Sequence, residues 1–192
     1  MTNRCAWPTG NQIMIDYHDH EWGVPLHDDI KIFEFMVLDA FQAGLSWLTI
    51  LKKRENFRNA FDNYDLKKIA GYGEKDFNRL MNDAGIIRNR LKITATIQNA
   101  IQYQKIQQEF GSFDAYIWHF TDGKTIVNTW KNIGELPAKN ELSDRISKDL
   151  LKRGFKFVGS TIIYAFMQAM GIVNDHTTDC YRYQELAGMA KK

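Results

Sequence analysis

The residues best suited to bind a metal ion lie near the two ends of the chain. Cys5 and His18 lie near the amino terminus, and His176 and Cys180 lie near the carboxyl terminus. Two thiolates and two imidazoles form a closed tetrahedral set that suits structural zinc and leaves no position open for a substrate. The His-x-x-x-Cys spacing predicts that His176 and Cys180 share one helical turn. A metal bound there would tie the two ends of the chain together.

Spacing alone leaves alternatives to this set open. His20 and His27 are also near enough along the chain to serve as the second ligand, and the cysteines are compatible with two unrelated buried thiols. The first eight residues lack the apolar segment of a secretory signal, so we expect reduced thiols rather than a disulfide.

A group of aromatic residues and one acid could bind a flat cationic ligand. Trp7, Tyr17 and Trp22 lie near the amino terminus, and Trp47 follows an apolar segment that contains Asp39. Burial would raise the pKa of Asp39, which makes it a candidate for proton chemistry or for pairing with a cation. Tryptophan faces would add cation–π attraction of about 1 to 2 kcal/mol each. The alternative is that these aromatic side chains only fill the core.

A basic segment near residue 150 has the pattern of a phosphate-binding turn. Arg145–Lys156 carries five positive charges and one negative charge, and a short turn with a glycine at each edge follows. Backbone amides at the start of the next helix can bind phosphates without reading base sequence, although a basic helix end in solvent is the alternative. The candidate DNA-binding residues here are Lys152, Arg153, Gly154, Lys156, Gly159, Ser160 and Thr161.

Helices must position these residues, because apolar side chains recur every three or four positions between glycines. We predict an all-α fold. Its last predicted helix is nearly apolar, so we expect that helix to lie at the centre of the fold. The predicted helices are His27–Phe41, Ser46–Phe61, Asp65–Ala70, Glu74–Asp83, Asn89–Phe110, Ser143–Arg153 and Ser160–Met170. Only Lys124–Trp130 suggests an extended segment. We expect residues 1–186 to form one domain with room for two helical lobes, and residues 187–192 to form a frayed, disordered tail.

The composition excludes several classes of protein. The chain has 192 residues with 44% hydrophobic and 25% charged residues, which is typical of a globular domain rather than a disordered one. A formal net charge of +2 is too small for a purely electrostatic tail that binds nucleic acid. No apolar segment is long enough to cross a membrane. We therefore expect a cytoplasmic enzyme or binding domain.

Several long motifs together resemble one family. Residues 17–25 (YHDHEWGVP), 42–55 (QAGLSWLTILKKRE), 83–88 (DAGIIR), 153–159 (RGFKFVG) and 173–176 (VNDH) closely resemble 3-methyladenine DNA glycosylase I, over about residues 4–181. This resemblance implies a helix-hairpin-helix DNA glycosylase fold, with structural zinc held by Cys5, His18, His176 and Cys180. It also implies a base pocket of Trp7, Tyr17, Trp22 and Trp47, and a loop containing Gln42, Gly44 and Leu45 that enters the duplex, with Leu45 as the wedge.

The resemblance further implies the reaction. A monomeric enzyme of base excision repair would bind alkylated double-stranded DNA, flip out N3-methyladenine and release it as the free base by hydrolysis. Bifunctional relatives carry a lysine where this chain has Ser160 and Thr161, so we expect no strand cleavage. One departure concerns the site: Asp39 and Ala40 stand where the family usually has glutamate and glycine.

This departure keeps two other interpretations open. One is a non-catalytic domain that binds damaged DNA, and the other is a glycosylase with an altered base preference. A catalytic zinc hydrolase is the weakest interpretation, because four protein ligands leave the metal no open position.

Overall fold

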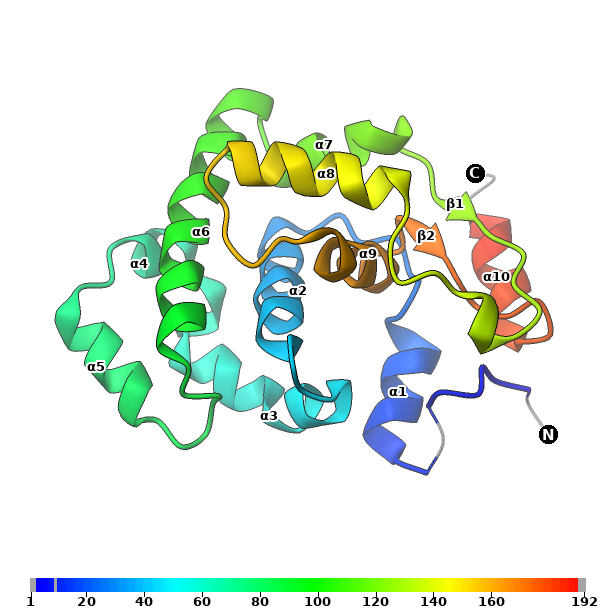
Figure 1. The fold of residues 1–192 in the computed structure, drawn as a ribbon, viewed down its shortest axis with the longest axis horizontal. Coiled ribbons are helices and arrows are strands. Elements are labelled where there is room, and N and C mark those ends of the chain that lie inside the picture. The colour runs from blue at the N-terminus through cyan, green and yellow to red at the C-terminus, as the bar shows by residue number, and fades with distance from the viewer. Residues whose placement is uncertain (1–2, 9, 190–192) are drawn as a thin grey trace.

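The structure is a computed structural model that describes residues 3–8 and 10–189, and its regular secondary structure is almost entirely helical (Figure 1). The α-helices are α1 (Gln12–His20), α2 (Asp29–Gln42), α3 (Trp47–Ala60), α4 (Leu66–Ala70), α5 (Glu74–Asn82), α6 (Arg90–Phe110), α7 (Phe113–Trp118), α8 (Glu141–Lys152), α9 (Ser160–Ala169) and α10 (Tyr181–Met189). Short 3-10 helices are η1 (Asp62–Tyr64), η2 (His119–Thr121) and η3 (Ile133–Glu135). Two strands, β1 (Ile126–Val127) and β2 (Val173–Asn174), form one parallel pair. The all-α prediction is therefore confirmed apart from this pair.

Helix α2 lies at the centre of the molecule because its sequence leaves no face for solvent. Every residue from Ile32 to Phe41 is buried. Helix α9 packs against α2, as expected for the nearly apolar helix predicted there. In Figure 1 these two helices lie between α4, α5 and α6 on one side and α1 and α10 on the other. One hydrophobic cluster extends through these helices from Cys5 to Cys180.

Side-chain caps explain where most helices begin. Asn140 caps α8 by accepting from the backbone N–H of Ser143, whose hydroxyl in turn accepts from the N–H of Asn140. The predicted start at Ser143 is therefore wrong by two residues, because this serine is the third residue of a capping box. Four other caps lie where the sequence predicts helix starts, namely Asp28, Ser46, Asp65 and Asn89.

The amino-terminal segment and the start of α10 lie on the same side of the molecule (Figure 1). The backbone N–H of Tyr181 donates to the carbonyl of Asn3 at 3.0 Å. Helix α10 continues to Met189, so the expected disordered tail is wrong for residues 187–189, which are helical although Gly188 and Met189 are exposed. Residues 190–192 lie outside the described part. Helices α1, α7 and α10 were not predicted. No helix among the described residues is long and apolar enough to cross a membrane.

Candidate functional site

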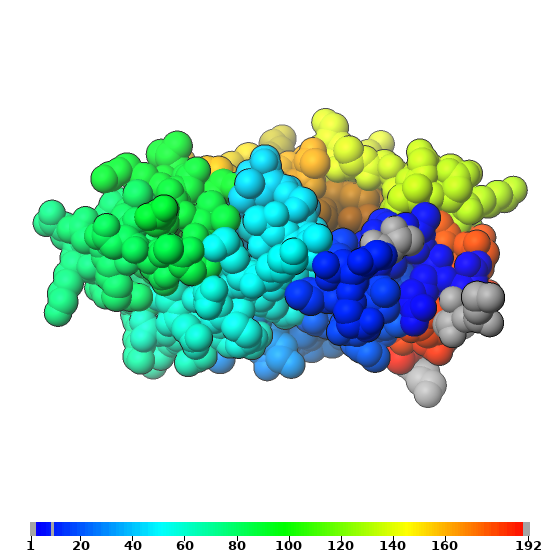
Figure 2. Space-filling view, turned by 90° about the horizontal axis from the view of Figure 1, so that it is seen from below, coloured from blue at the N-terminus to red at the C-terminus, as the bar shows by residue number. Residues whose placement is uncertain are grey.

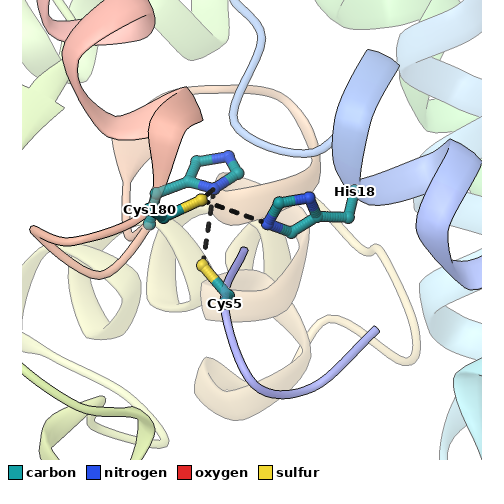
Figure 3. Close-up of side chains that lie close together, drawn as sticks. Cys5, His18 and Cys180 are labelled. Carbon is teal, nitrogen blue, oxygen red and sulfur yellow. Dashed lines mark hydrogen bonds between the residues drawn. The ribbon is translucent and has the colours of Figure 1, made fainter. Parts of the chain in front are cut away.

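Four buried side chains from the two ends of the chain converge on one point (Figure 3). The ligand atoms of Cys5, His18, His176 and Cys180 all lie within 4.8 Å of one another. The Cys5 Sγ to His176 Nδ1 distance is 3.5 Å, and Cys180 Sγ lies 3.5 Å from His18 Nε2 and 3.4 Å from His176 Nδ1. Zinc bonds of about 2.3 Å to sulfur and about 2.0 Å to nitrogen require S···N separations of about 3.5 Å in a tetrahedron. The donor set and its spacing therefore fit a tetrahedral ion.

Each histidine of this cluster is oriented by its other ring nitrogen. His18 Nδ1 lies 2.8 Å from Asp19 Oδ1, and His176 Nε2 lies 3.0 Å from the carbonyl oxygen of Trp22. Because both partners are acceptors, those nitrogens carry the protons and the opposite nitrogens present lone pairs to the cluster. Contacts with the Cys5 thiol and the two imidazoles lower the pKa of Cys180, which favours a thiolate there.

The structure settles which histidines belong to the cluster. His20 is exposed, and His27 bonds Asp114 and stacks on Trp118, so neither alternative ligand lies in it. His176 and Cys180 do come together, but the predicted helical turn is wrong, because His176 precedes the helix and only Tyr181 begins α10. A turn between residues 177 and 180 brings the two side chains together instead.

The cluster of Cys5, His18, His176 and Cys180 also positions the aromatic residues. The Trp7 ring lies 5.3 Å from His18, and Trp22 lies 4.6 Å from His176, measured between ring centroids. Tyr17 immediately precedes His18 on α1, and Trp7 follows Cys5 by two positions. Ordering of the cluster therefore orders three of the four predicted pocket residues.

All four predicted aromatic residues line one pocket of about 210 Å³. Trp7 and Trp22 meet edge to face with centroids 5.1 Å apart, and Tyr17 and Trp47 are tilted at 5.2 Å. Figure 2 shows the orange of α9 at the bottom of a hollow between the blue amino-terminal segment and the cyan start of α3. The remaining lining residues are Met14, Asp39, Gln42, Ile133, Leu136, Ala165 and Gln168.

Three buried polar atoms that line this pocket have no hydrogen-bond partner among the described residues. They are the indole nitrogens of Trp7 and Trp47 and the Oδ2 atom of Asp39. Burial raises the pKa of Asp39 well above its ordinary value, as its apolar neighbours in the sequence predict. Burial, followed by the Asp39 carboxylate, also raises the pKa of Tyr17, so its hydroxyl stays protonated. The walls of the pocket therefore contain two indole N–H groups and one carboxyl oxygen that have no partner among the described residues.

Sequence reasoning missed Gln168, which lines the same pocket from α9. Its Nε2 donates to Asp175 Oδ2 at 2.7 Å, and this carboxylate also accepts from Tyr164, Asn128 and Trp130. Since a carboxylate only accepts, the amide of Gln168 has a fixed orientation and its oxygen remains free to accept another bond. The available signal was the one amide side chain in a nearly apolar helix.

A second pocket continues the first towards the loop between α2 and α3. It has a volume of about 250 Å³ and shares Asp39, Gln42 and Ala165 with the aromatic pocket. The predicted loop residues Gly44 and Leu45 form one wall, and Thr161 lies on α9 opposite. Gly44 has a φ of +80°, a backbone conformation that favours glycine. Leu45 is 41% exposed at this loop, as a wedge would require.

The turn between α8 and α9 leads directly into the start of α9, where Thr161 lines the second pocket together with this loop. Gly154 has a φ of +94° and ends α8, and Gly159 caps α9 without a side chain. The first backbone N–H groups of α9, at Ser160 and Thr161, therefore have no intrahelical acceptor. Lys152 and Lys156 are exposed beside this turn.

Arg153 differs from its neighbours in the basic segment. It pairs with Asp149 at 2.7 Å and with Glu109 at 2.6 Å, and it stacks over the rings of Phe110 and Tyr116. The side chain thus joins α8 to α6, and its charge is already balanced within the protein. Its position does not support the phosphate contact expected for it.

A further cavity of about 430 Å³ lies on another face and has a different character. Five of its charged side chains pair with one another, since Arg54 bonds both Glu21 and Glu34, and Arg58 bonds Glu34 and Glu55. Because these charges are already paired, the aromatic pocket is the better candidate for a functional site.

Comparisons with known proteins agree on one family. The sequence model of the methyladenine glycosylase family matches residues 7–183. The chain is 48% identical over 180 residues to DNA-3-methyladenine glycosylase 1 of Escherichia coli (strain K12), covering 94% of this chain and 96% of that protein.

Solved structures of the same kind of protein superpose closely. A crystal structure of 3-methyladenine DNA glycosylase I aligns with a TM-score of 0.91 and 47% identity, covering 93% of this chain and 98% of that one. A variant of 3-methyladenine DNA glycosylase I in complex with 3-methyladenine aligns with a TM-score of 0.90 and 36% identity, over 94% of this chain and 97% of that one. The chain described here belongs to the methyladenine glycosylase family.

Proposed function

We propose that this protein is a DNA glycosylase that extrudes N3-methyladenine from alkylated duplex DNA and releases the free base by hydrolysis. The observation that carries the proposal is the aromatic pocket with three unpartnered polar groups, at Trp7, Trp47 and Asp39. Unsatisfied buried polar groups are rare in proteins and mark a site that a polar ligand completes. Membership of the methyladenine glycosylase family agrees with this ligand.

The pocket favours a cationic purine over a neutral one. Methylation at N3 leaves the base in DNA positively charged, so the tryptophan faces attract it through cation–π interactions. Asp39 adds a carboxylate that gains a partner only when a cation enters. A neutral adenine gains much less from both groups, and its extrusion from a normal pair costs more.

The reaction requires little proton transfer. The bond between C1′ and the base nitrogen breaks, and its electron pair goes to the base, which leaves as neutral 3-methyladenine. The sugar becomes an oxocarbenium-like cation, water adds at C1′ and loses a proton, and an abasic site remains. Asp39 binds the base and stabilises the developing positive charge. Tyr17, which stays protonated, acts as a hydrogen-bond donor.

Two elements hold the DNA in this proposal. The loop of Gln42, Gly44 and Leu45 enters the duplex beside the extruded base. The α8–α9 turn is a helix-hairpin-helix element that binds a backbone phosphate at the amides of Ser160 and Thr161. Lys152 and Lys156 add attraction that weakens at high salt, because binding releases counterions from the DNA and this release is less favourable in concentrated salt.

We further propose that Cys5, His18, His176 and Cys180 hold zinc as a structural ion. The ion supplies folding energy at the joined chain ends, which hold Trp7, Tyr17 and Trp22 in the pocket. With four protein ligands it has no open position for chemistry. The supporting observation is the match between the observed S···N separations and a tetrahedral zinc site. Because one chain supplies every element of the site, we also propose that the enzyme acts as a monomer. We propose that it acts in the cytoplasm.

Release of free 3-methyladenine from N-methylated duplex DNA tests the proposal. Chromatography of the supernatant is expected to show the base with the wild type, and much less with Asp39→Asn. Asp39→Glu restores the side-chain length usual in the family and is expected to equal or exceed the wild type. Binding of the DNA without release of any base would instead support a non-catalytic damage-binding domain.

A second candidate is a glycosylase of altered base preference. Asp39 is one methylene shorter than glutamate, and its Oδ2 has no partner among the described residues, so a differently placed cationic purine could meet it. Release of another alkylated purine in preference to 3-methyladenine, reversed by Asp39→Glu, would favour this candidate. Treatment with borohydride is expected to trap no covalent adduct, since no lysine occupies positions 160 and 161.

A further inference from the structure

Lys92, near the start of α6, is a buried cation with an unusual pair of acceptors. Its side chain is only 6% exposed, and its Nζ donates to the carbonyl oxygens of Phe41 at 2.8 Å and Ala43 at 2.6 Å. Both carbonyls lie at the carboxyl end of α2, where the helix dipole favours a positive charge. The ammonium therefore binds the end of α2 at the point where the exposed loop to α3 begins.

This loop has few other internal contacts. Residues 43 to 46 are all exposed, and within the loop the N–H of Leu45 donates to the carbonyl of Gln42. Lys92 is thus the side chain that ties the loop to α6. Charge-assisted hydrogen bonds of this kind are stronger and more directional than neutral ones.

The same face of α6 also holds the α8–α9 turn. Asn99 is buried, and it donates to the carbonyl of Lys156 at 2.9 Å while accepting from the Lys156 N–H at 2.8 Å. Gln98 donates to the carbonyl of Gly154 at 2.7 Å. These bonds brace a turn in which Phe157 has a φ of +54°, a conformation that is unfavourable for a bulky residue.

The spacing along α6 explains why one helix serves both elements. Lys92 and Asn99 are seven residues apart, which is nearly two turns, so they lie on one face. Their separation along the axis is about 10 Å, on the order of three base steps of about 3.4 Å each. A single rigid helix therefore sets the position of the loop relative to the phosphate-binding turn.

We propose that Lys92 is a positioning residue that fixes the position of the Gln42–Leu45 loop relative to the α8–α9 turn. The loop then enters the duplex at the place where the extruded base leaves it. This inference rests on the proposed glycosylase function. Lys92 contacts neither the base pocket nor the DNA directly, and it acts through the loop.

The test separates binding of the base from extrusion of the base. Lys92→Met keeps the length of the side chain but removes the charge and the donors. Affinity for free 3-methyladenine, measured by tryptophan fluorescence, is expected to stay within twofold of wild type, because the pocket residues are unchanged. The kcat/KM for release from methylated duplex DNA is expected to fall at least tenfold. Hydrogen exchange at Gly44 and Leu45 is expected to become faster.

Two variants serve as controls. Lys53→Met is the matched control, because Lys53 also donates to two backbone carbonyls, those of Ala84 and Gly85, but in another loop. Its affinity for free 3-methyladenine and its kcat/KM for release are both expected to stay within twofold of wild type. Lys92→Arg keeps the cation and its donors and is expected to recover most of the lost rate.

Several results would overturn the inference. One is release by Lys92→Met at the wild-type rate, and another is a loss of base affinity in proportion to the rate. If circular dichroism shows that Lys92→Met does not fold, Lys92→Gln takes its place with the same readouts. If the wild type itself releases no 3-methyladenine, the proposed function fails. The exchange measurement then still tests whether Lys92 holds the loop, and unchanged exchange would refute it.

Discussion

Replacing Asp39 by asparagine should make the free protein more stable at neutral pH while it makes the enzyme less active. Asp39 is fully buried, and burial raises the pKa of its carboxyl well above the ordinary value. Its Oδ2 has no hydrogen-bond partner among the described residues. Ionisation of this group in the folded protein is therefore costly, and asparagine cannot ionise.

The sign of the pH dependence follows from linkage. The unfolded carboxyl has a pKa of about 3.9, so between that pH and the raised folded pKa the folded protein binds more protons than the unfolded chain. The free energy of unfolding of the wild type must then fall as pH rises through this window. Below about pH 4 both states are protonated, and the two proteins should be equally stable.

The magnitude follows from the cost of ionising a buried group without a partner, for which about 1 to 3 kcal/mol, the cost of an unpaired buried polar group, is the lower range. At pH 8, Asp39→Asn should raise the free energy of unfolding by about that amount. For a chain of this size, each kcal/mol shifts the melting temperature by about 2 to 4 °C, so the increase should be roughly 2 to 12 °C. Such a trade of stability for activity is common at functional sites.

The assay is urea denaturation of both proteins from pH 4 to pH 9, together with base release at each pH. Protonation of the Cys and His cluster affects both proteins equally, so it cancels in the difference. Asp29→Asn is the matched control on the same helix, because Asp29 accepts from the backbone N–H groups of Phe113 and Asp114. That substitution should destabilise by about 1 to 3 kcal/mol.

Two results would refute the reasoning about Asp39. One is an Asp39→Asn protein that is less stable than the wild type at pH 8. The other is a difference in stability that does not change with pH.

Three further predictions concern the metal, the basic turn and the wedge. Cys180→Ser, or removal of the proposed zinc ion by a chelator, should lower the melting temperature and loosen the amino-terminal segment. Metal analysis and thermal melts check this, and an unchanged melting temperature would contradict it. Lys156→Ala should weaken DNA binding and reduce the slope of log K against log salt by about 1. Arg153→Ala should instead lower stability and leave that slope nearly unchanged, because its charge is paired within the protein; equal slopes for both variants would be the contrary result. Leu45→Ala should slow base release from duplex DNA but leave the affinity for free 3-methyladenine unaltered, and fluorescence titration beside the release assay distinguishes the two.

Much of the fold could be read from local patterns. Capping residues and apolar periodicity act within one or two turns, so the sequence by itself determined where α2, α3, α4 and α6 begin. It also placed Asp39 in an apolar segment, which is sufficient to predict its burial and its raised pKa. The short helices α1, α7 and α10 were missed because their stability comes from packing rather than from their own sequence.

Only the tertiary structure decided which residues meet. His18 and His20 are only two positions apart, so spacing along the chain does not choose between them, and only His18 is brought to the two cysteines in the folded structure. The sequence suggests that the charge of Arg153 is available for phosphate, but in the folded structure Glu109, which is distant in sequence, pairs with it. Lys92 had no visible role until α6 placed its ammonium at the end of α2. Side-chain identity and local spacing determine what a residue can do. Long-range packing determines its partners, and these partners cannot be deduced from the separation of residues along the sequence.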